Sequence, residues 1–196
     1  LKDLNKKFKI PILYITHSIE EISQIGDQIV LIKDGKKIDS GGVSNIFNRS
    51  SFIDLTGKFE SSSILEGKVY GHDKNLHMTT LDLNGQKLVV PGLPGNLNDM
   101  VRVRIRSRDI LLSSSRIKTQ ITENELQGLI SSIEIENNSA FSELVIVLKN
   151  FKNKKKQRLR VRITTYNLKN MKLSRNNTVS IYISSVSIDR QAYQSK

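Results

Sequence analysis

His17 has the setting that most suggests chemistry in this sequence. It follows an apolar run from Ile10 to Ile15, which has the pattern of a strand buried on both faces. Ser18, directly after it, is a natural N-cap for a helix. Ligands of α/β sheets bind at such an edge, where strands end and helices begin. A neutral imidazole at this place could hydrogen-bond a phosphate or a water; the alternative is a histidine that only caps or packs against the helix.

The largest concentration of charge is a basic run from Lys152 to Arg160. Lys and Arg number 31 against 19 Asp and Glu, and the resulting net charge of +12 invites a nucleic-acid interpretation. An OB-fold that binds single strands needs aromatic stacking platforms, and only Phe151 lies close to the run. A solvated loop is therefore the favoured interpretation, with attraction to an anionic membrane surface as an alternative. No nucleic-acid partner is expected.

The composition gives little support to metal or disulfide chemistry. The chain has no Cys, which excludes a disulfide scaffold and a cysteine metal site. His72 and His77 lie near Asp73, but no third ligand is evident, so no metal site is predicted. No stretch approaches the ~18–20 apolar residues that span a bilayer. Hydrophobic residues make up 37% and aromatic residues 6%, which suits small β domains better than one large core.

The elements around His17 alternate between α and β patterns. Ile19, Ile22 and Ile25 give the next segment the apolar face of a helix, and Gly26 ends it. Asp34-Gly35 is a strong hairpin signal. The expected elements of this region are, in chain order, a helix end (1–9), a strand (10–15), a helix (18–26), two strands (28–33 and 36–40) and a short helix (41–47).

Residues 64–190 have a different character, with recurring strand patterns separated by turns. A weak internal repeat relates three pairs of segments. These pairs are 64–69 with 125–130, 81–90 with 144–163, and 101–107 with 179–185. Two repeats of about five strands each predict paired OB-like barrels. Packing one barrel against the other would enlarge a small core.

The predicted fold is therefore an α/β fragment followed by an all-β domain of two OB-like barrels. A polar, Ser-rich stretch indicates the boundary between them. The predicted limits are 1–55 for the α/β piece, 56–63 for a linker, 64–118 for the first repeat, 119–190 for the second repeat and 191–196 for a tail.

Residues 13–22, Leu-Tyr-Ile-Thr-His-Ser-Ile-Glu-Glu-Ile, resemble the switch-histidine segment of ABC ATPases. Residues 26–36 are similar to the next segment of that family, and 44–47 stand where it has a short helix. In the family, the histidine contacts the γ-phosphate of ATP and helps to orient the attacking water. The resemblance implies this catalytic role for His17, an ABC ATPase origin for residues 1–55, and ATP and Mg as cofactors of the intact subunit.

The parts of that family that hold ATP are absent from this sequence. No G-x-x-x-x-G-K-[ST] loop occurs, and the glycine-rich signature segment is missing. Only sixteen residues precede His17, where an apolar strand ending in Asp-Glu would stand. The start at Leu1 suggests a partial sequence. Because phosphoryl transfer needs a phosphate cradle, a metal and a positioned nucleophile together, the chain alone is expected to be inactive.

The C-terminal region resembles the regulatory domain of molybdate importer ATPases, which carries a molybdenum-pterin-binding-protein-like module. The segments that carry this resemblance are 61–65, 101–112, 122–128, 162–164 and 183–186. The two resemblances together imply the ATP-binding, energy-coupling subunit of a bacterial ABC importer for molybdate or tungstate. They also imply a homodimer at the cytoplasmic face of the cell membrane, an integral membrane permease as partner, and indirect dependence on a periplasmic or lipid-anchored substrate-binding protein.

The family module binds its oxyanion with hydroxyls, backbone N–H groups, a Lys and an Arg. Here Glu123 replaces that Arg and Ser184 replaces that Lys, whereas Arg106 holds the equivalent place in the first repeat. A tetrahedral dianion needs donors and positive charge without a competing carboxylate. The candidate residues for regulatory molybdate or tungstate are Thr122, Asn124, Arg162, Thr164 and Ser185. The alternative is that the barrels serve only dimer contacts.

Two other functions remain open. Sugar and spermidine importers are alternatives, because the sugar-importer ATPases share the switch-histidine segment and carry OB-like tails. A stand-alone OB-like module for an anion or a nucleic acid belongs to a different class. The long match over residues 10–47 and the poor supply of aromatic residues argue against that module.

Overall fold

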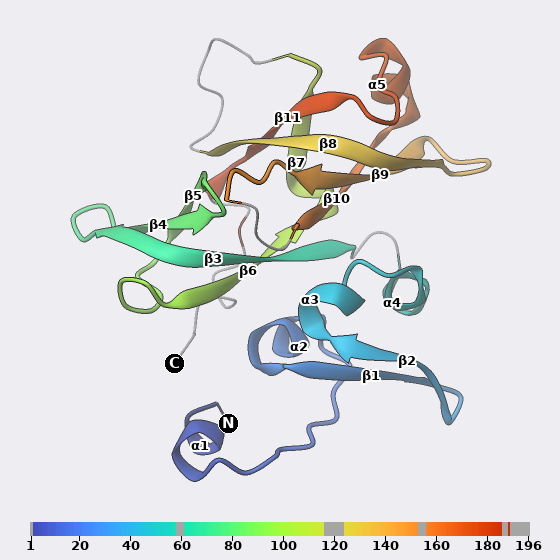
Figure 1. The fold of residues 1–196 in the computed structure, drawn as a ribbon. Helices are drawn as coiled ribbons and strands as arrows, with labels where there is room; N and C mark the ends of the chain where they lie inside the picture. The colour runs from blue at the N-terminus through green and yellow to red at the C-terminus, as the bar shows by residue number, and fades with distance from the viewer. Residues whose placement is uncertain (1, 58–60, 116–123, 153–155, 186–187, 189–196) are drawn as a thin grey trace.

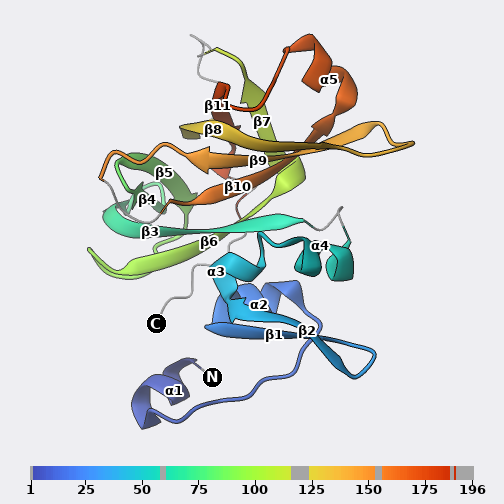
Figure 2. The same cartoon turned by 45° about the vertical axis from the view of Figure 1, so that its right-hand side comes forward.

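The computed structural model describes residues 2–57, 61–115, 124–152, 156–185 and 188. The chain is mostly β with few helices. A small N-terminal part lies at one end of two curved antiparallel sheets (Figure 1 and Figure 2). Within the described ranges, no helix is long and apolar enough to cross a membrane.

The N-terminal part contains four helices and one hairpin. Ser18 is the N-cap of α2, where its Oγ accepts a hydrogen bond from the Glu21 N–H at 3.2 Å. Asp34 and Gly35 both adopt positive φ and form the tight turn of the hairpin. The predicted N-cap at Ser18 and the predicted hairpin turn at Asp34-Gly35 are thus confirmed. The elements are α1 (Lys2–Phe8), α2 (Ile19–Ile25), β1 (Gln28–Lys33), β2 (Lys36–Gly42), α3 (Val43–Ile46) and α4 (Ser50–Thr56).

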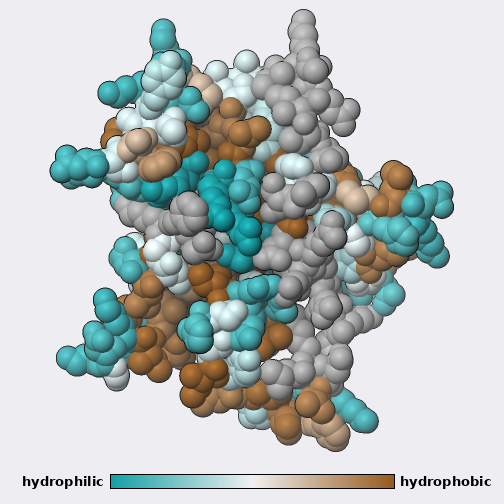
Figure 3. All heavy atoms as spheres, turned by 180° about the vertical axis from the view of Figure 1, so that it is seen from behind, coloured by the Kyte–Doolittle hydropathy of each residue, from teal (hydrophilic) through white to brown (hydrophobic). Residues whose placement is uncertain are grey.

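The apolar run from Ile10 to Ile15 is not the predicted buried strand. It has no strand assignment, and the side chains of Leu13 and Ile15 are 91% and 90% exposed. A strand buried on both faces needs neighbouring strands and covering helices, and no described segment pairs with this run. The hydrophobic side chains of this part gather along the lower edge of the molecule in Figure 3.

The β region forms a four-stranded sheet with the order β5-β4-β3-β6 and a five-stranded sheet with the order β10-β9-β8-β11-β7. The strands of the first sheet are β3 (Ser62–Asp73), β4 (Met78–Leu83), β5 (Gln86–Pro91) and β6 (Met100–Arg106). A 3-10 turn, η2 (Ser107–Asp109), leads to β7 (Ile110–Ser113). The remaining elements are β8 (Asn124–Ile135), β9 (Phe141–Leu148), β10 (Arg158–Thr164), α5 (Thr165–Asn170) and β11 (Thr178–Ile183). Strand β3 thus begins at Ser62, inside the segment predicted as a linker.

The two halves repeat one another in strand order and in detail. The register of β3 shifts between Val69 and Gly71, and that of β8 shifts between Ile130 and Ser132, at the matching place of each repeat. The halves also exchange their ends. Strand β7 leaves the first half to pair with β11, and Ile188 returns from the second half to pair with Ile105. One hydrophobic core, filled from both sheets, results from this exchange.

Reciprocal side-chain amides join the two sheets. The Gln86 side chain accepts from the Gln127 N–H at 2.6 Å and donates to the Gln127 carbonyl at 3.0 Å. In the other direction, Gln157 accepts from the Glu66 N–H at 2.7 Å and donates to the Glu66 carbonyl at 2.8 Å. Each amide therefore satisfies both backbone groups of one residue in the opposite repeat, as a neighbouring strand would.

Close approach of strands selects glycine at matching positions of β3 and β8. A Cβ at Gly67 would lie 2.8 Å from Leu81 Cβ, and a Cβ at Gly128 would lie 2.4 Å from Ile146 Cγ2. These contacts are too short for any side chain, so the core has no room at either place.

We expect Gly128→Ala to lower the free energy of unfolding by about 1–3 kcal/mol, because the new methyl group overpacks the core. Urea unfolding measures the difference. Gly71→Ala is the matched control, since nothing lies within 4 Å of its Cβ position. Equal losses in the two variants would show that strand spacing at Gly128 is not the constraint.

Candidate functional site

A buried polar cluster forms where β3 begins beside the end of β6. It consists of Ser61, Ser62, Arg104, Arg106 and Ser107, and we call it the Ser61–Arg106 cluster. Ser62 pairs with Arg106 in the register of the two strands. Ser61, Ser62 and Ser107 are at most 1% exposed and Arg104 is 4% exposed, an unusual burial for residues of these types.

Hydrogen bonds hold the backbone of this cluster in place. The Ser107 N–H and hydroxyl both donate to the Ser61 carbonyl at 2.9 Å. The Arg104 Nε donates to the Ser62 hydroxyl at 3.0 Å. From the second sheet, the Arg160 N–H donates to the hydroxyl of the next residue, Ser63, at 2.8 Å. The cluster is therefore rigidly supported by both repeats.

Several buried polar atoms in and beside this cluster have no partner. Among the described residues, Ser61 Oγ, Arg106 Nε, Arg160 Nε and Glu143 Oε2 are buried without a hydrogen-bond partner, and Glu143 Oε2 lies 4.0 Å from Arg160 Nη1. A buried donor without a partner costs about 1–3 kcal/mol, and such groups usually meet an ion or a water. Cationic donors and hydroxyls together match what an oxyanion requires. The sequence prediction includes Arg106 but none of these serines as binding residues; Ser61 and Ser62 fall in the predicted linker, and Ser107 falls in the segment 101–112.

Asn124 and Ser185, two of the predicted anion-binding residues, do lie together. The Asn124 Nδ2 is 3.3 Å from Ser185 Oγ, and both groups donate to the Val89 carbonyl at 2.9 Å. The Asn124 Oδ1 also accepts from the Val89 N–H at 2.5 Å. Their polar atoms thus join β8 and the end of β11 to β5.

Arg162 and Thr164 lie at the other end of the second sheet. The Arg162 Nη1 is 2.8 Å from both Glu136 and Glu143, so two carboxylates balance its charge. Thr164 caps α5 by accepting from the Asn167 N–H at 3.1 Å. In the register of β8 and β9, Glu143 lies opposite Glu134, and Glu134 is ten residues along β8 from Asn124. This separation corresponds to about 33 Å of strand.

One copy of the chain therefore does not bring the predicted set together. Asn124 and Ser185 share one end, whereas Arg162 and Thr164 share the other. Thr122 and Glu123 lie outside the described residues. The sequence does not predict this separation. The internal repeat shows which segments correspond, but it does not show at which end of the sheet a residue lies or which carboxylates lie beside it.

His17 stands on the exposed turn that leads into α2. Glu21 shapes this turn, because it accepts hydrogen bonds from Thr16 Oγ1 and from the Tyr14 hydroxyl. The hydrogen bond to Glu21 raises the pKa of Tyr14. His72, by contrast, shares a hydrogen bond of 2.7 Å with Thr79. In the part of the chain that the structure describes, no three His, Asp or Glu side chains group so as to hold a metal.

Known proteins match the chain over most of its length. Molybdenum import ATP-binding protein ModC of Haemophilus influenzae is 35% identical over 136 residues, which are 69% of this chain and 39% of that protein. ModC of Mesorhizobium japonicum is 30% identical over 133 residues, or 68% of this chain and 36% of that protein. ModC of Haemophilus ducreyi is 30% identical over 148 residues, or 75% and 42%. This chain is homologous to the C-terminal part of the ModC proteins.

The chain spans about two fifths of the length of these curated ModC relatives. All three of these relatives are named as molybdenum import ATP-binding proteins. No protein-family model matches the chain.

A solved structure supports the fold of the β region. The cytoplasmic molybdate-binding protein ModG, solved with molybdate bound, aligns with 65% of this chain and 93% of its own, with a TM-score of 0.54 and 15% identity. At this identity the likeness concerns the fold alone.

Glu143 is the buried carboxylate beside Arg162, and it is only 2% exposed. Burial raises its pKa, while the hydrogen bond from Arg162 opposes that rise. A raised pKa means that the folded state holds the proton more tightly than the unfolded chain. The resulting stability is fully present below the ordinary carboxyl pKa and is lost as pH rises through the folded pKa.

Glu143→Gln removes this titration and keeps the shape of the side chain. The free energy of unfolding of the variant, relative to that of the unchanged chain, should therefore rise between about pH 4 and about pH 7. Urea unfolding at both pH values measures it. A difference that stays constant or falls with pH would contradict the assigned cause.

Proposed function

We propose that the chain is the C-terminal, regulatory part of the ATP-binding subunit of an ABC importer for molybdate or tungstate. The observation that carries the proposal is the 35% identity over 136 residues to a protein named as a molybdenum import ATP-binding protein. The ModG-like fold of the β region agrees with it. The intact subunit, in this proposal, is an ATPase that couples hydrolysis to transport.

The N-terminal part is, in this proposal, the end of the ATPase domain, residues 1–55. His17 would contact the γ-phosphate of ATP and orient the attacking water, with ATP and Mg held by the intact subunit only. Its exposed position at the start of α2 leaves the imidazole accessible to such a ligand. Without a phosphate cradle, the chain by itself does not hydrolyse ATP.

The β region is the proposed sensor, with two OB-like barrels over residues 64–118 and 119–190, after a linker over 56–63 and before a tail over 191–196. We assign the oxyanion site of the first repeat to the Ser61–Arg106 cluster, because the Ser61 hydroxyl and the cationic Arg106 Nε are buried there without a hydrogen-bond partner. Thr122, Asn124, Arg162, Thr164 and Ser185 are the proposed donors of the second repeat. They are a weaker set within one copy, because Glu136 and Glu143 neutralise Arg162.

The proposed setting is the cytoplasmic face of the cell membrane. There the intact subunit would form a homodimer and bind an integral membrane permease. A periplasmic or lipid-anchored binding protein would deliver the substrate indirectly. Contacts between two β regions would steady the dimer.

Isothermal titration of the purified chain tests the sensor role. We expect heat of binding with molybdate and with tungstate but not with sulfate. Arg106→Gln should weaken binding roughly tenfold or more, because a charged hydrogen bond contributes about 1.5–3 kcal/mol. Arg175→Gln, which removes the same charge from an exposed turn, is the matched control.

Two outcomes would count against this assignment. No heat with any of the anions, from a folded chain, removes the sensor role and leaves the homology to ModC intact. Equal binding by the Arg106 and Arg175 variants moves the site away from the Ser61–Arg106 cluster.

A further inference from the structure

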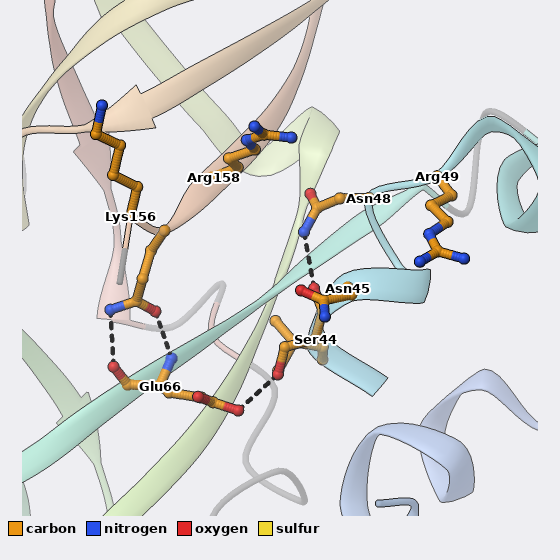
Figure 4. A pocket seen from close by; sticks show the side chains of 9 residues that line it. Ser44, Asn45, Asn48, Arg49, Glu66, Lys156 and Arg158 are labelled. Carbon is orange, nitrogen blue, oxygen red and sulfur yellow. Dashed lines mark hydrogen bonds between the residues drawn. The ribbon is translucent and has the colours of Figure 1, made fainter. Parts of the chain in front are cut away.

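A pocket, which we call the junction pocket, lies where the N-terminal part meets the two sheets. It has a volume of about 360 Å³ and opens between α3, β3 and the start of β10 (Figure 4). Its lining comes from three separate places in the chain: Ser44, Asn45, Asn48 and Arg49; Ile64 and Glu66; and Lys156, Gln157 and Arg158. None of these residues belongs to the Ser61–Arg106 cluster.

The floor of this junction pocket is fixed and electrically balanced. Ser44 Oγ donates to Glu66 Oε1 at 2.6 Å, and Arg102 Nε lies 3.4 Å from the same oxygen. Gln157 holds the Glu66 backbone through both of its amide atoms. The single carboxylate of the lining is therefore already engaged, and its repulsion of an anion is reduced.

One wall of the junction pocket carries unbalanced positive charge. Lys156 and Arg158 are exposed, and neither has an ion-pair partner among the residues that the structure describes. Arg49, also in the lining, differs because it is paired with Asp39 at 2.6 Å. Exposed cationic side chains attract an anionic group, and the planar guanidinium of Arg158 suits the paired oxygens of a phosphate.

The opposite wall carries neutral hydrogen-bonding groups. Ser44, Asn45 and Asn48 come from α3 and the turn after it, facing the β10 side of the pocket (Figure 4). The Asn48 Nδ2 already donates to the Ser44 carbonyl at 3.0 Å, whereas Asn45 is exposed. Amides of this kind bind hydroxyl-bearing groups, and Ile64 adds one apolar contact.

We propose that the junction pocket binds a small organic phosphate. Its volume falls within the range of about 300–1,000 Å³ that is typical of small-molecule sites. The phosphate binds Lys156 and Arg158, and the hydroxylated body of the ligand contacts Asn45 on the opposite wall. Because the two walls belong to different parts of the chain, the ligand also stabilises their docking. This site is additional to the proposed oxyanion sensor and does not depend on it.

Titration calorimetry with ribose 5-phosphate, inorganic phosphate and ribose tests this site in the full chain. Ribose 5-phosphate should bind several-fold more tightly than inorganic phosphate, and ribose should not bind detectably. The double variant Lys156→Gln, Arg158→Gln should weaken ribose 5-phosphate by roughly a hundredfold, about tenfold for each charged hydrogen bond. Asn45→Ala should weaken ribose 5-phosphate and leave inorganic phosphate unchanged.

The double variant Lys169→Gln, Arg175→Gln is the matched control, because it removes the same charge from exposed positions in and after α5. It should bind ribose 5-phosphate like the unchanged chain. The proposal is overturned if the folded chain does not bind ribose 5-phosphate. It is also overturned if both double variants bind equally, or if ribose 5-phosphate and inorganic phosphate bind equally. Loss of molybdate binding in Arg106→Gln concerns the sensor site and leaves this proposal untouched.

Discussion

The two sheets depend on a reciprocal exchange of side-chain amides. Gln86 completes the hydrogen bonds of Gln127 in the opposite repeat, and Gln157 completes those of Glu66. A buried backbone N–H or carbonyl without a partner is costly. These amides therefore restrict how the repeats can sit against one another. The shared core and the exchanged ends result from the same pseudo-symmetric arrangement.

The same interface determines where the polar groups can act. Arg160 lies on β10, yet its N–H supports Ser63 and its Nη2 donates to the Asn48 carbonyl at 3.2 Å. Arg102 on β6 donates to the Gly26 carbonyl at 2.7 Å, at the end of the helix after His17. The Ser61–Arg106 cluster, the junction pocket and the N-terminal part are thus joined by arginines from the sheets. A ligand at either site contacts elements whose positions are already restricted by these bonds.

Much of the local structure was predictable from short-range chemistry. Ser18 caps α2 and Asp34-Gly35 forms the hairpin turn, because both depend on the conformations of only a few residues. The repeat in the sequence also predicted matching segments, and both halves have the same strand order. The run from Ile10 to Ile15 was different. Its burial requires partners at a distance in the chain, and the described residues supply none.

The sequence by itself determined the caps, the turns, the repeat and the resemblance to an importer subunit, since these reside in residue types and their local spacing. Only the tertiary structure decided which polar residues are available to a ligand. It pairs Arg162 with Glu143 of β9 and with Glu136, the residue after β8, and it buries Ser61 Oγ and Arg106 Nε without hydrogen-bond partners. The physical reason is that electrostatic interaction weakens with distance, so the groups nearest in space decide whether a charge is already balanced. In an antiparallel β fold, those neighbours come from strands that are distant in the sequence.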